Sequence, residues 1–425
     1  MASLSAAPQL ELDDGFVVAT GIECSAPVVR GNIRQDELVK TGHWERYEQD
    51  YALVSSFGIR YVRWGVPFHV VAVSDRVTDF DWRWTDAALS ALRDQGLEPI
   101  LDLLHFGLPD DITAMGDPRL VGRFEKFARA VAERYPWARY YTPVNEPLVS
   151  AVLSAEAGLW NERRRDQRSF VAAIDSLVTC AVRGMEIIRE RRPDAIFLQS
   201  DACSSFQPAD SSAEERAAFL NEQAFVCWDL TYGRRPNEQV VDWLTAHGLS
   251  EERLAWFAEH GSSEGCIVGH DYYRGNEWIV GPGLKPRRAG SRRRGYLALA
   301  REYAARYDLP FMLSETNIAG SRAPRWLAEV WNDALTLRAE GAPIRGITWY
   351  GFVDHVDWDS GLVRNRGHVN TCGLVGLDRT PHRVGRLYRD LAQAALAGRF
   401  EPLNIGERDG GRDGGRDAPP LYATA

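Results

Sequence analysis

The chain contains 425 residues, of which 45% are hydrophobic and 26% are charged. This composition is typical of a globular protein, and the length alone suggests two or three domains. The formal net charge of −9 argues against nucleic acid as the main partner, because binding to phosphates requires a basic face.

The cysteines and the N-terminal sequence indicate the cellular compartment in which the protein is expected. There is no CxxC pair and no His/Cys spacing typical of a metal site, which favours free thiols in a reducing compartment. The first residues lack the charged and apolar segments of a signal peptide, and no run of about 18 apolar residues occurs. We therefore expect a cytoplasmic protein without membrane association. The oligomeric state stays open. The cysteines are Cys24, Cys180, Cys203, Cys227, Cys266 and Cys372.

Two terminal stretches are predicted to lie outside the folded domain. Residues 1–12 are expected to form a flexible N-terminus. In the C-terminal stretch 401–425, an Arg-Asp-Gly-Gly unit at 408–411 is repeated at 412–415 and begun again at 416. Glycine with alternating charge buries little apolar surface, so this tail is predicted to be disordered. No Pro-rich or Gly/Ser-rich linker divides residues 13–400, which we expect to form one domain.

Eight short apolar runs recur along this domain, each followed by a helical pattern. The helical pattern is clear from Leu120 to Val131, between Asp117 as a predicted N-cap and Pro136 as a stop. Eight strand-helix repeats predict an α/β fold, a single (β/α)8 TIM barrel, with functional residues at the C-terminal ends of the strands. The runs are 16–22, 59–64, 98–104, 139–144, 195–199, 266–269, 310–313 and 345–350, and further helices are expected at 169–192 and 326–339.

One inter-strand segment is longer than the others. Residues 200–265 exceed what a single crossover needs, and we expect extra helices there, over the barrel mouth.

Two glutamates follow predicted strands in similar settings. Glu146 follows Asn145 at the end of the run 139–144, and Glu315 follows the run 310–313. Hydrolysis of a glycosidic bond uses two such carboxyl groups, one to protonate the leaving oxygen and one to attack the sugar carbon. Either glutamate alone would more often be a solvated loop residue or a helix cap. The pair in matching settings favours a glycosidase.

Further polar and aromatic residues are expected at the same end of the barrel. A pyranose requires donors and acceptors at its hydroxyls and an aromatic surface at its C–H face. Taken singly, Trp64 and Tyr272 are more often barrel core. The other candidates are Arg63, His105, His270, Asp271, Tyr273, Trp349, Asp354, Asp357 and Trp358.

In these stretches the sequence resembles glycoside hydrolase family 1, the retaining β-glycosidases. Residues 145–147, Asn-Glu-Pro, are similar to the acid/base motif, and 314–317, Ser-Glu-Thr-Asn, stand where the family has its Thr-Glu-Asn-Gly nucleophile motif. Residues 105–109 resemble its His-Trp-Asp-Leu-Pro turn, 349–358 its Trp-Ser-Leu-Leu-Asp-Asn-Phe-Glu-Trp segment, and 372–378 its Gly-Leu-Val stretch. The five motifs follow in order within residues 15–395, and together they are far more specific than any one.

The resemblance implies roles for individual residues. It implies Glu146 as general acid/base and Glu315 as nucleophile, with Arg63 and Tyr273 hydrogen-bonded to the nucleophile. Such partners would keep Glu315 ionised, and its charge would raise the pKa of Glu146. The implied sugar contacts are Asn145 at the 2-hydroxyl, His105 at the 3-hydroxyl, Trp349 under the ring, and Asp357 and Trp358 at the far edge. We expect no metal and no organic cofactor.

The sequence departs from the family pattern at three positions that would contact the sugar or shape its pocket. The family's first-strand glutamine has no clear match, and Glu23 is the nearest candidate. The glutamate that usually binds the 4- and 6-hydroxyls corresponds to Asp357, one carbon shorter, in a segment with one extra residue. Asp271 replaces an asparagine. The sugar pocket is therefore predicted to be altered, as in a divergent branch of the family, and the sugar need not be glucose.

The sequence thus favours a retaining, exo-acting β-glycosidase that acts on a glycoside or oligosaccharide through a covalent glycosyl-enzyme. An endo-acting glycanase of the same clan and a transglycosidase remain alternatives. An alternative of another class is a catalytically silent barrel that binds a sugar or a partner protein.

Overall fold

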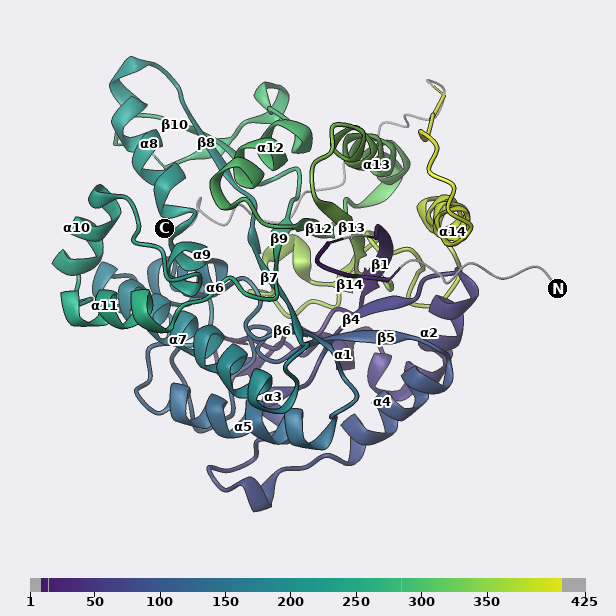
Figure 1. Cartoon of the computed structure of the whole chain (residues 1–425), viewed down its shortest axis with the longest axis horizontal. Helices are drawn as coiled ribbons and strands as arrows, with labels where there is room; N and C mark the ends of the chain where they lie inside the picture. The colour runs from purple at the N-terminus through teal and green to yellow at the C-terminus, as the bar shows by residue number, and fades with distance from the viewer. Residues whose placement is uncertain (1–8, 14, 284, 407–425) are drawn as a thin grey trace.

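The computed structural model describes residues 9–13, 15–283 and 285–406. Its centre is a closed barrel of eight parallel strands in the order β1-β13-β12-β9-β7-β6-β5-β4 (Figure 1). Parallel pairing of β1 with β13, from Val17 opposite Gly346 to Gly21 opposite Tyr350, closes it. Each predicted apolar run is a strand, so the predicted TIM barrel is confirmed. The strands are β1 (Val17–Gly21), β4 (Tyr61–Gly65), β5 (Glu98–Asp102), β6 (Tyr140–Thr142), β7 (Ile196–Ala202), β9 (Cys266–Asp271), β12 (Phe311–Thr316) and β13 (Ile344–Tyr350).

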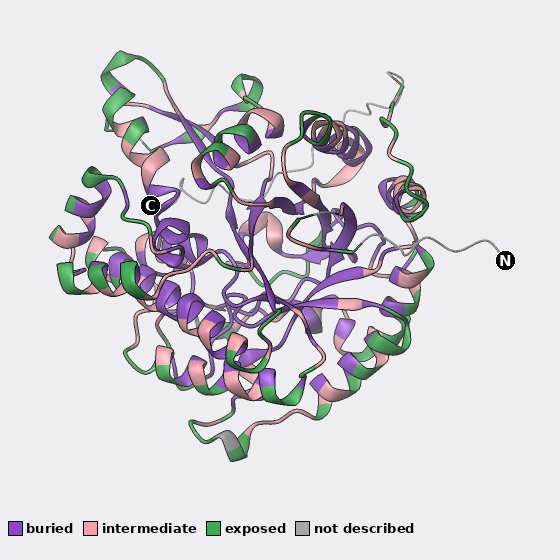
Figure 2. Cartoon of the chain, viewed as in Figure 1, coloured by how far each residue is buried: buried purple, intermediate pink, exposed green. Residues whose placement is uncertain are grey.

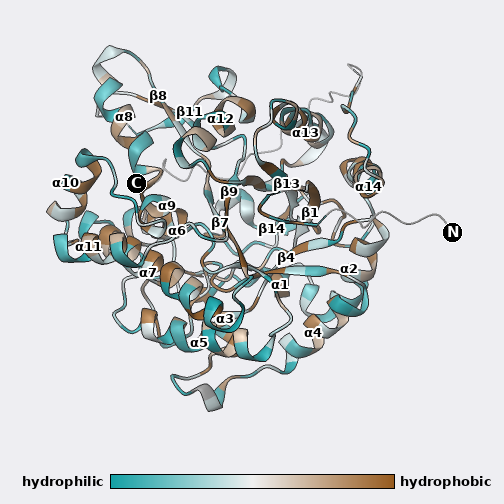
Figure 3. Ribbon diagram, in the orientation of Figure 1, coloured by the Kyte–Doolittle hydropathy of each residue, from teal (hydrophilic) through white to brown (hydrophobic). Residues whose placement is uncertain are grey.

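Helices surround this barrel and bury their apolar faces against it (Figure 2). Hydrophilic residues occupy the outer faces of α4 and α5 (Figure 3), which is the amphipathic pattern that the sequence predicts. The larger helices are α2 (His43–Ser56), α4 (Arg83–Asp94), α5 (Leu120–Arg134), α7 (Gln167–Arg191), α12 (Tyr296–Tyr307), α13 (Ala323–Ala339) and α14 (Arg383–Leu396). Shorter elements are α1 (Glu37–Lys40), α3 (Phe68–Val71), α6 (Pro147–Ala151), β2 (Val28–Val29), β3 (Ile33–Arg34), β14 (His355–Val356) and β15 (Val369–Asn370).

Helix starts differ from the predicted ones by two or three residues. Asp117 does not cap α5 directly. Its carboxylate accepts from the Arg119 N–H at 2.9 Å within a turn, and the helix begins at Leu120. The predicted helix at 169–192 instead begins with Asp166 as N-cap, whose side chain accepts from the Ser169 N–H at 2.8 Å.

The segment between β7 and β9 holds four helices and one strand of a small three-stranded sheet, whose other two strands follow β9. The sheet joins β8 (Ser205–Pro208), β10 (Glu277–Val280) and β11 (Arg287–Arg288). The helices are α8 (Glu214–Gln223), α9 (Val226–Thr231), α10 (Glu238–Ala246) and α11 (Glu251–His260). The extra helices are therefore present, but none of their residues lines the central pocket. They flank the barrel rather than cover its mouth (Figure 1).

Two hydrophobic layers cover the two sides of the barrel strands. The larger lies between the strands and the surrounding helices. The smaller fills the inside of the barrel with residues such as Val17, Ala19 and Tyr61, which alternate with residues that face the helices. Leu10 belongs to this inner layer, is 1% exposed, and donates its N–H to the Tyr61 hydroxyl at 3.0 Å. The chain before β1 thus packs on the barrel.

The chain after α14 also packs on the barrel. The ring of Phe400 meets Phe16 edge-on with centroids 5.6 Å apart, and the Trp331 indole donates to the Glu401 carbonyl at 2.8 Å. Leu10 and Glu401 lie within the stretches 1–12 and 401–425 that are predicted to lie outside the folded domain, and Phe400 lies directly before the second stretch. At these residues the chain is packed on the barrel instead. The rest of those stretches, 1–8 and 407–425, lies outside the described residues.

All six cysteines are buried and unpaired, as predicted for free thiols. None of the helices in the described ranges has the length and apolar character that crossing a membrane requires.

Candidate active site

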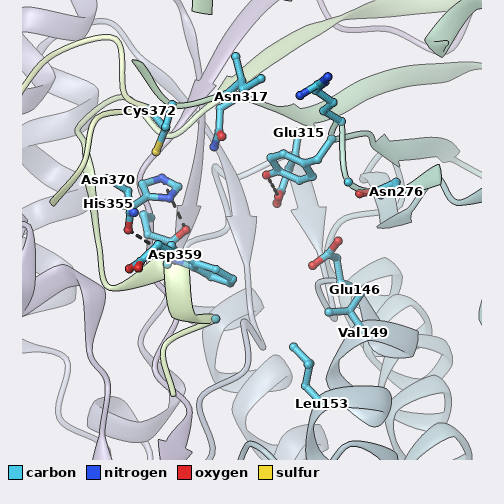
Figure 4. A pocket seen from close by; sticks show the side chains of 18 of the residues that line it. Glu146, Val149, Leu153, Asn276, Glu315, Asn317, His355, Asp359, Asn370 and Cys372 are labelled. Carbon is cyan, nitrogen blue, oxygen red and sulfur yellow. Dashed lines mark hydrogen bonds and ion pairs between the residues drawn. The ribbon is translucent and has the colours of Figure 1, made fainter. Parts of the chain in front are cut away.

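A pocket opens at the C-terminal ends of the barrel strands, where the fold predicts it (Figure 4). Its lining includes Glu23 after β1, His105 after β5, Glu146 after β6, Tyr273 after β9 and Glu315 on β12. Five segments that are far apart in the sequence therefore contribute to one cavity, because parallel strands end at the same rim of the barrel.

Glu146 is held in an unusual backbone conformation between β6 and α6. Its φ is 41°, in the left-handed region, and Pro147 begins the short helix α6. The Glu146 N–H donates to the Ser200 carbonyl at 3.0 Å, and the Asp201 carboxylate accepts from the Leu148 N–H at 2.8 Å. Residues with such strain persist only where surrounding contacts fix them, and they cluster at functional sites.

The environment of Glu146 favours its protonated form. The side chain is 8% exposed, and burial raises the pKa of the carboxyl well above its usual range. The negative charges of Asp271 and Glu315 raise it further. Asp271, the substitute for an asparagine, is itself fully buried and accepts from the Ser314 hydroxyl at 2.6 Å. A carboxyl that stays protonated near neutral pH can donate a proton to a leaving group.

Glu315 has the opposite environment. Arg63 donates to one of its carboxylate oxygens at 2.5 Å, and the Tyr273 hydroxyl donates to the other at 2.7 Å. Both hydrogen bonds implied by the family resemblance are therefore present. A cation and a hydroxyl donor stabilise the ionised form of a carboxylate, which is the form that can act as a nucleophile.

Arg63 also connects Glu315 to the Glu146 side of the pocket. Its second terminal nitrogen donates to the Asn145 side-chain oxygen at 2.6 Å, to Asp102 at 3.2 Å and to the Ser200 hydroxyl at 3.1 Å. Burial disfavours the charged guanidinium, but the carboxylates of Glu315, Asp271 and Asp102 outweigh it and raise the Arg63 pKa. The guanidinium therefore stays charged and fixes the position of its partners.

His105 and Asn145 form a hydrogen-bonded pair beside this network. The His105 Nδ1 lies 2.9 Å from Asp102, and its Nε2 lies 3.3 Å from the Asn145 amide nitrogen. With the ring proton on Nδ1 and donated to Asp102, Nε2 accepts from the amide. The two side chains implied to contact the 2- and 3-hydroxyls are thus adjacent, and His105 lines the pocket.

Trp349 does not reach the pocket, contrary to the role that the resemblance implies. Its indole is fully buried, donates to the Cys372 carbonyl at 2.8 Å and packs beside Tyr388 of α14. The next residue, Tyr350, points the other way, with its ring parallel to His105 at 5.9 Å and the Arg63 guanidinium 5.3 Å from its centroid. Successive side chains of a strand face opposite sides, so Tyr350 rather than Trp349 lies on the side of His105 and Arg63.

Asp357 does not line the pocket either. Its carboxylate is fully buried and accepts from Lys40 at 3.1 Å and from the N–H groups of Arg366, Gly367 and His368 at 2.9 to 3.1 Å. Burial opposes the charged form, but these donors outweigh it and lower the Asp357 pKa. This carboxylate anchors a loop and is not placed to bind a sugar.

Of the remaining expected residues, Glu23 and Trp358 line the pocket, whereas His270 and Asp354 do not. Glu23 accepts from the Ser25 N–H at 2.8 Å and lies 3.8 Å from the imidazole of His355. His355 and Asp359 also line the pocket, although no pattern in the sequence pointed to them. Asp102, another residue without an assigned role, could have been noticed as an acid inside an apolar run.

Comparisons with known proteins relate the chain to one family of sequences and to one fold. The sequence model of the family described as "Glycosyl hydrolase family 1" matches residues 28–234. An aryl-phospho-β-D-glucosidase from Bacillus subtilis is 22% identical over 213 residues, and a 6-phospho-β-galactosidase from Lacticaseibacillus rhamnosus is 25% identical over 191 residues. These alignments cover 47% and 42% of this chain and 44% and 39% of the relatives, so less than half of each relative is matched.

Solved structures match over nearly the whole chain. A family 1 β-glucosidase from Thermotoga maritima has a TM-score of 0.77 at 16% identity, covering 93% of this chain and 100% of the other. The same enzyme in complex with glucoimidazole has a TM-score of 0.76 at 16% identity, with 89% and 97% covered. At this identity the likeness establishes the shared barrel fold.

Proposed function

Because the chain is a distant relative of glycosyl hydrolase family 1, we propose that it is a retaining, exo-acting β-glycosidase. The observation that carries the proposal is the contrast between its two pocket glutamates. Glu315 is bound by Arg63 and Tyr273, while Glu146 is buried beside other carboxyl groups, which raises its pKa. One carboxylate is suited to attack, and the other carboxyl group is suited to donate a proton.

The reaction proceeds in two displacements. In the first, Glu315 attacks the anomeric carbon, the glycosidic C–O bond breaks, and Glu146 gives its proton to the leaving oxygen. The products are a covalent glycosyl-enzyme and the free alcohol. Loss of the Glu315 charge lowers the pKa of Glu146, because the two groups repel one another when both are ionised. Glu146 then takes a proton from water as this water attacks the anomeric carbon, which releases the sugar with its original configuration.

The shape of the site supports exo action. The far edge of a sugar held between the two glutamates would meet side chains of the loop after β13, such as His355 and Trp358, rather than an open groove. An endo-acting glycanase requires room for sugar units on both sides of the cleaved bond. The substrate we propose is therefore a small glycoside or the end of an oligosaccharide.

The free cysteines support a cytoplasmic location, because reducing compartments keep thiols unpaired. The acidic net charge supports a substrate other than nucleic acid.

The test is hydrolysis of a panel of nitrophenyl β- and α-glycosides by the wild-type protein and by Glu315→Gln, with the product anomer followed by proton NMR. We expect turnover of at least one β-glycoside with retention, and loss of kcat by more than about 10³-fold in the variant. Glu302→Gln is the matched control, since Glu302 is an exposed α12 residue paired with Arg294. Its activity should equal that of the wild type.

Four results would contradict the proposal. Near-wild-type activity of Glu315→Gln would exclude Glu315 as the nucleophile. A product of inverted configuration would exclude the covalent glycosyl-enzyme. Transfer to added alcohols in preference to water would indicate a transglycosidase. A folded protein that binds sugars in a melting assay but hydrolyses none of the panel would indicate a silent binding barrel.

A further inference from the structure

Asp201, near the end of β7, carries a buried carboxyl group outside the pocket. It is 1% exposed, and it is not among the residues that line the pocket. The side chain of the preceding residue, Ser200, faces the barrel interior and accepts from Arg63 at 3.1 Å. Because successive side chains of a strand face opposite sides, that of Asp201 points outward, toward the short helix α6 that follows Glu146 (Figure 1).

The helix α6 lacks a cap from its own N-cap residue. The first N–H groups of a helix have no partner within it, and the side chain of the N-cap residue commonly accepts from one of them. The N-cap of α6 is Glu146, whose side chain makes no such bond and lies in the pocket instead (Figure 4). A carboxyl group that has to give a proton to a substrate cannot also cap its own helix.

Asp201 supplies this cap from the neighbouring strand. Its Oδ2 accepts at 2.8 Å from the N–H of Leu148, the second residue of α6. The Val149 N–H also stabilises the ionised form and so lowers the Asp201 pKa. The Oδ1 accepts from the Ala202 N–H at 2.8 Å, which fixes the carboxylate on its own strand. Backbone N–H groups of both β7 and α6 therefore hold the carboxylate, and it ties the two elements together.

Two consecutive residues of β7 thus hold the backbone on both sides of the catalytic acid. The Glu146 N–H donates to the Ser200 carbonyl at 3.0 Å, and the Asp201 carboxylate takes the N–H two residues further along the chain. Between these two hydrogen bonds Glu146 has a φ of 41°. A left-handed conformation of this kind is strained and persists only where its surroundings fix it. Without the cap, the turn can relax and move the Glu146 carboxyl group.

The Asp201 carboxyl group also faces other titratable groups. They are Glu146 before α6, Asp271 of β9 and the Cys227 thiol of α9, and none of them is a cation. Burial raises the Asp201 pKa to about 7, although backbone N–H groups oppose the rise. Above this pH the ionised group adds to the neighbouring carboxylates that raise the pKa of Glu146, an effect that His105 opposes.

Building on the proposed glycosidase activity, we propose that Asp201 is a positioning residue for the catalytic acid: it caps α6 in place of Glu146 and so holds the Glu146 carboxyl group in the pocket. Asp201 does not touch the substrate, and it acts only through the turn that carries Glu146. Its loss therefore weakens proton donation to the leaving group and leaves the attack by Glu315 intact.

The first test compares wild type and Asp201→Asn on an alkyl β-glycoside and on the 2,4-dinitrophenyl β-glycoside of the same sugar. Asparagine has a similar shape, but it offers one acceptor oxygen and no charge. A misplacement of about 1 Å can cost about 10²-fold, so kcat/KM on the alkyl glycoside should fall by about 10–100-fold. The dinitrophenyl value should change by less than about 3-fold, because this leaving group needs no acid. The alkaline limb of the alkyl pH profile should move to lower pH, because a charge that raises the Glu146 pKa is removed.

Asp333→Asn is the matched control. The Asp333 carboxylate accepts at 3.2 Å from the N–H of Leu297, the second residue of α12, so it caps a helix in the same manner without lining the pocket. This variant should change neither the leaving-group dependence nor the alkaline limb. Equal losses on the two substrates in Asp201→Asn, or wild-type values on both, would overturn the proposal, since a merely structural role lowers both activities alike.

The second test does not depend on turnover. Hydrogen exchange of peptides that cover residues 146–152 is followed by mass spectrometry in wild type, Asp201→Asn and Asp201→Ser. Serine is smaller and brings a single hydroxyl, so it serves if the asparagine NH2 group, set against a backbone N–H, prevents folding. We expect exchange at least about 10-fold faster in these peptides and an unchanged rate there in Asp333→Asn. If the wild type hydrolyses no glycoside, faster exchange still supports the cap, and only the proposed activity fails. Wild-type exchange of these peptides in the Asp201 variants would overturn the proposal.

Discussion

At the scale of single residues, the acid role of Glu146 depends on what surrounds its carboxyl group. Burial and the charges of Asp271 and Glu315 raise its pKa, which favours the protonated form that a general acid needs. Poor leaving groups need this proton, whereas highly activated ones depart without it. The role of Glu146 therefore predicts an effect that depends on the leaving group.

We expect Glu146→Ala to lower kcat/KM by about 10²–10⁴-fold on alkyl β-glycosides and by less than about 10-fold on a 2,4-dinitrophenyl β-glycoside. The wild-type kcat/KM on alkyl glycosides should fall as pH rises through the raised pKa of Glu146, because the acid loses its proton. The variant should lack this alkaline limb. Equal losses on both substrates would exclude Glu146 as the acid.

The sequence predicts most of these residues because they lie at or shortly after the ends of apolar runs. Arg63, Asn145, His105 and Tyr273 meet the two glutamates for this reason. The prediction that Trp349 lies under the sugar ring is wrong because side chains of a strand alternate between its two faces. An error of one residue in the alignment therefore selects a side chain on the wrong face. Asp359 could not be found in this way, since its orientation depends on a hydrogen bond to Arg366 within an irregular loop.

At the scale of elements, apolar periodicity predicts which segments are strands or helices but says little about where extra elements lie. The helices α8 to α11 are correctly expected within 200–265, yet they flank the barrel. Their position depends on contacts with α7 and with the small sheet, which no local pattern encodes. Contacts between distant elements are equally invisible in the sequence. One is the buried ion pair between Asp50 of α2 and Arg379, before α14.

Loss of this ion pair should destabilise the protein strongly. Arg379 donates to both oxygens of Asp50 at 2.7 and 2.9 Å and to the Thr41 carbonyl at 2.9 Å. Arg379→Met leaves a buried carboxylate without its cation, so we expect the free energy of unfolding in urea at pH 7 to fall by about 3–5 kcal/mol. Arg301→Met removes the exposed pair with Glu340 and should cost about 0–1 kcal/mol.

The effect of Arg379→Met should depend on pH. Burial opposes ionisation of Asp50, but hydrogen bonds from His43 and Arg379 outweigh it and lower the Asp50 pKa. A lowered folded-state pKa stabilises the protein above the unfolded-state pKa, and this contribution is lost as pH falls through the folded value. The difference between wild type and variant should therefore shrink in acid. A difference below about 1 kcal/mol at pH 7 would contradict this account.

At the scale of the whole molecule, both described ends of the chain cover the barrel side where β1 begins. Leu10 fills the inner layer, and the segment after α14 returns to Phe16, the residue before β1, and to α13. The first and last strands, β1 and β13, pair to close the barrel. Packing of the C-terminal segment therefore supports the seam on which closure depends.

This arrangement predicts that a chain ending at residue 406 is more stable than one ending at 399. The shorter chain loses the ring contact of Phe400 with Phe16 and three hydrogen bonds, from Trp331 to Glu401 and in both directions between Asn332 and Leu403. Half-burial of a phenylalanine and three hydrogen bonds together contribute about 2–4 kcal/mol. The melting temperature of the chain ending at 399 should fall by several degrees. Equal melting temperatures for the two chains would mean that closure of the barrel needs no support from this segment. A lower melting temperature with an unchanged kcat/KM would show that the segment contributes to stability and not to activity. This is the result we expect, because the segment packs at the end of the barrel opposite the pocket.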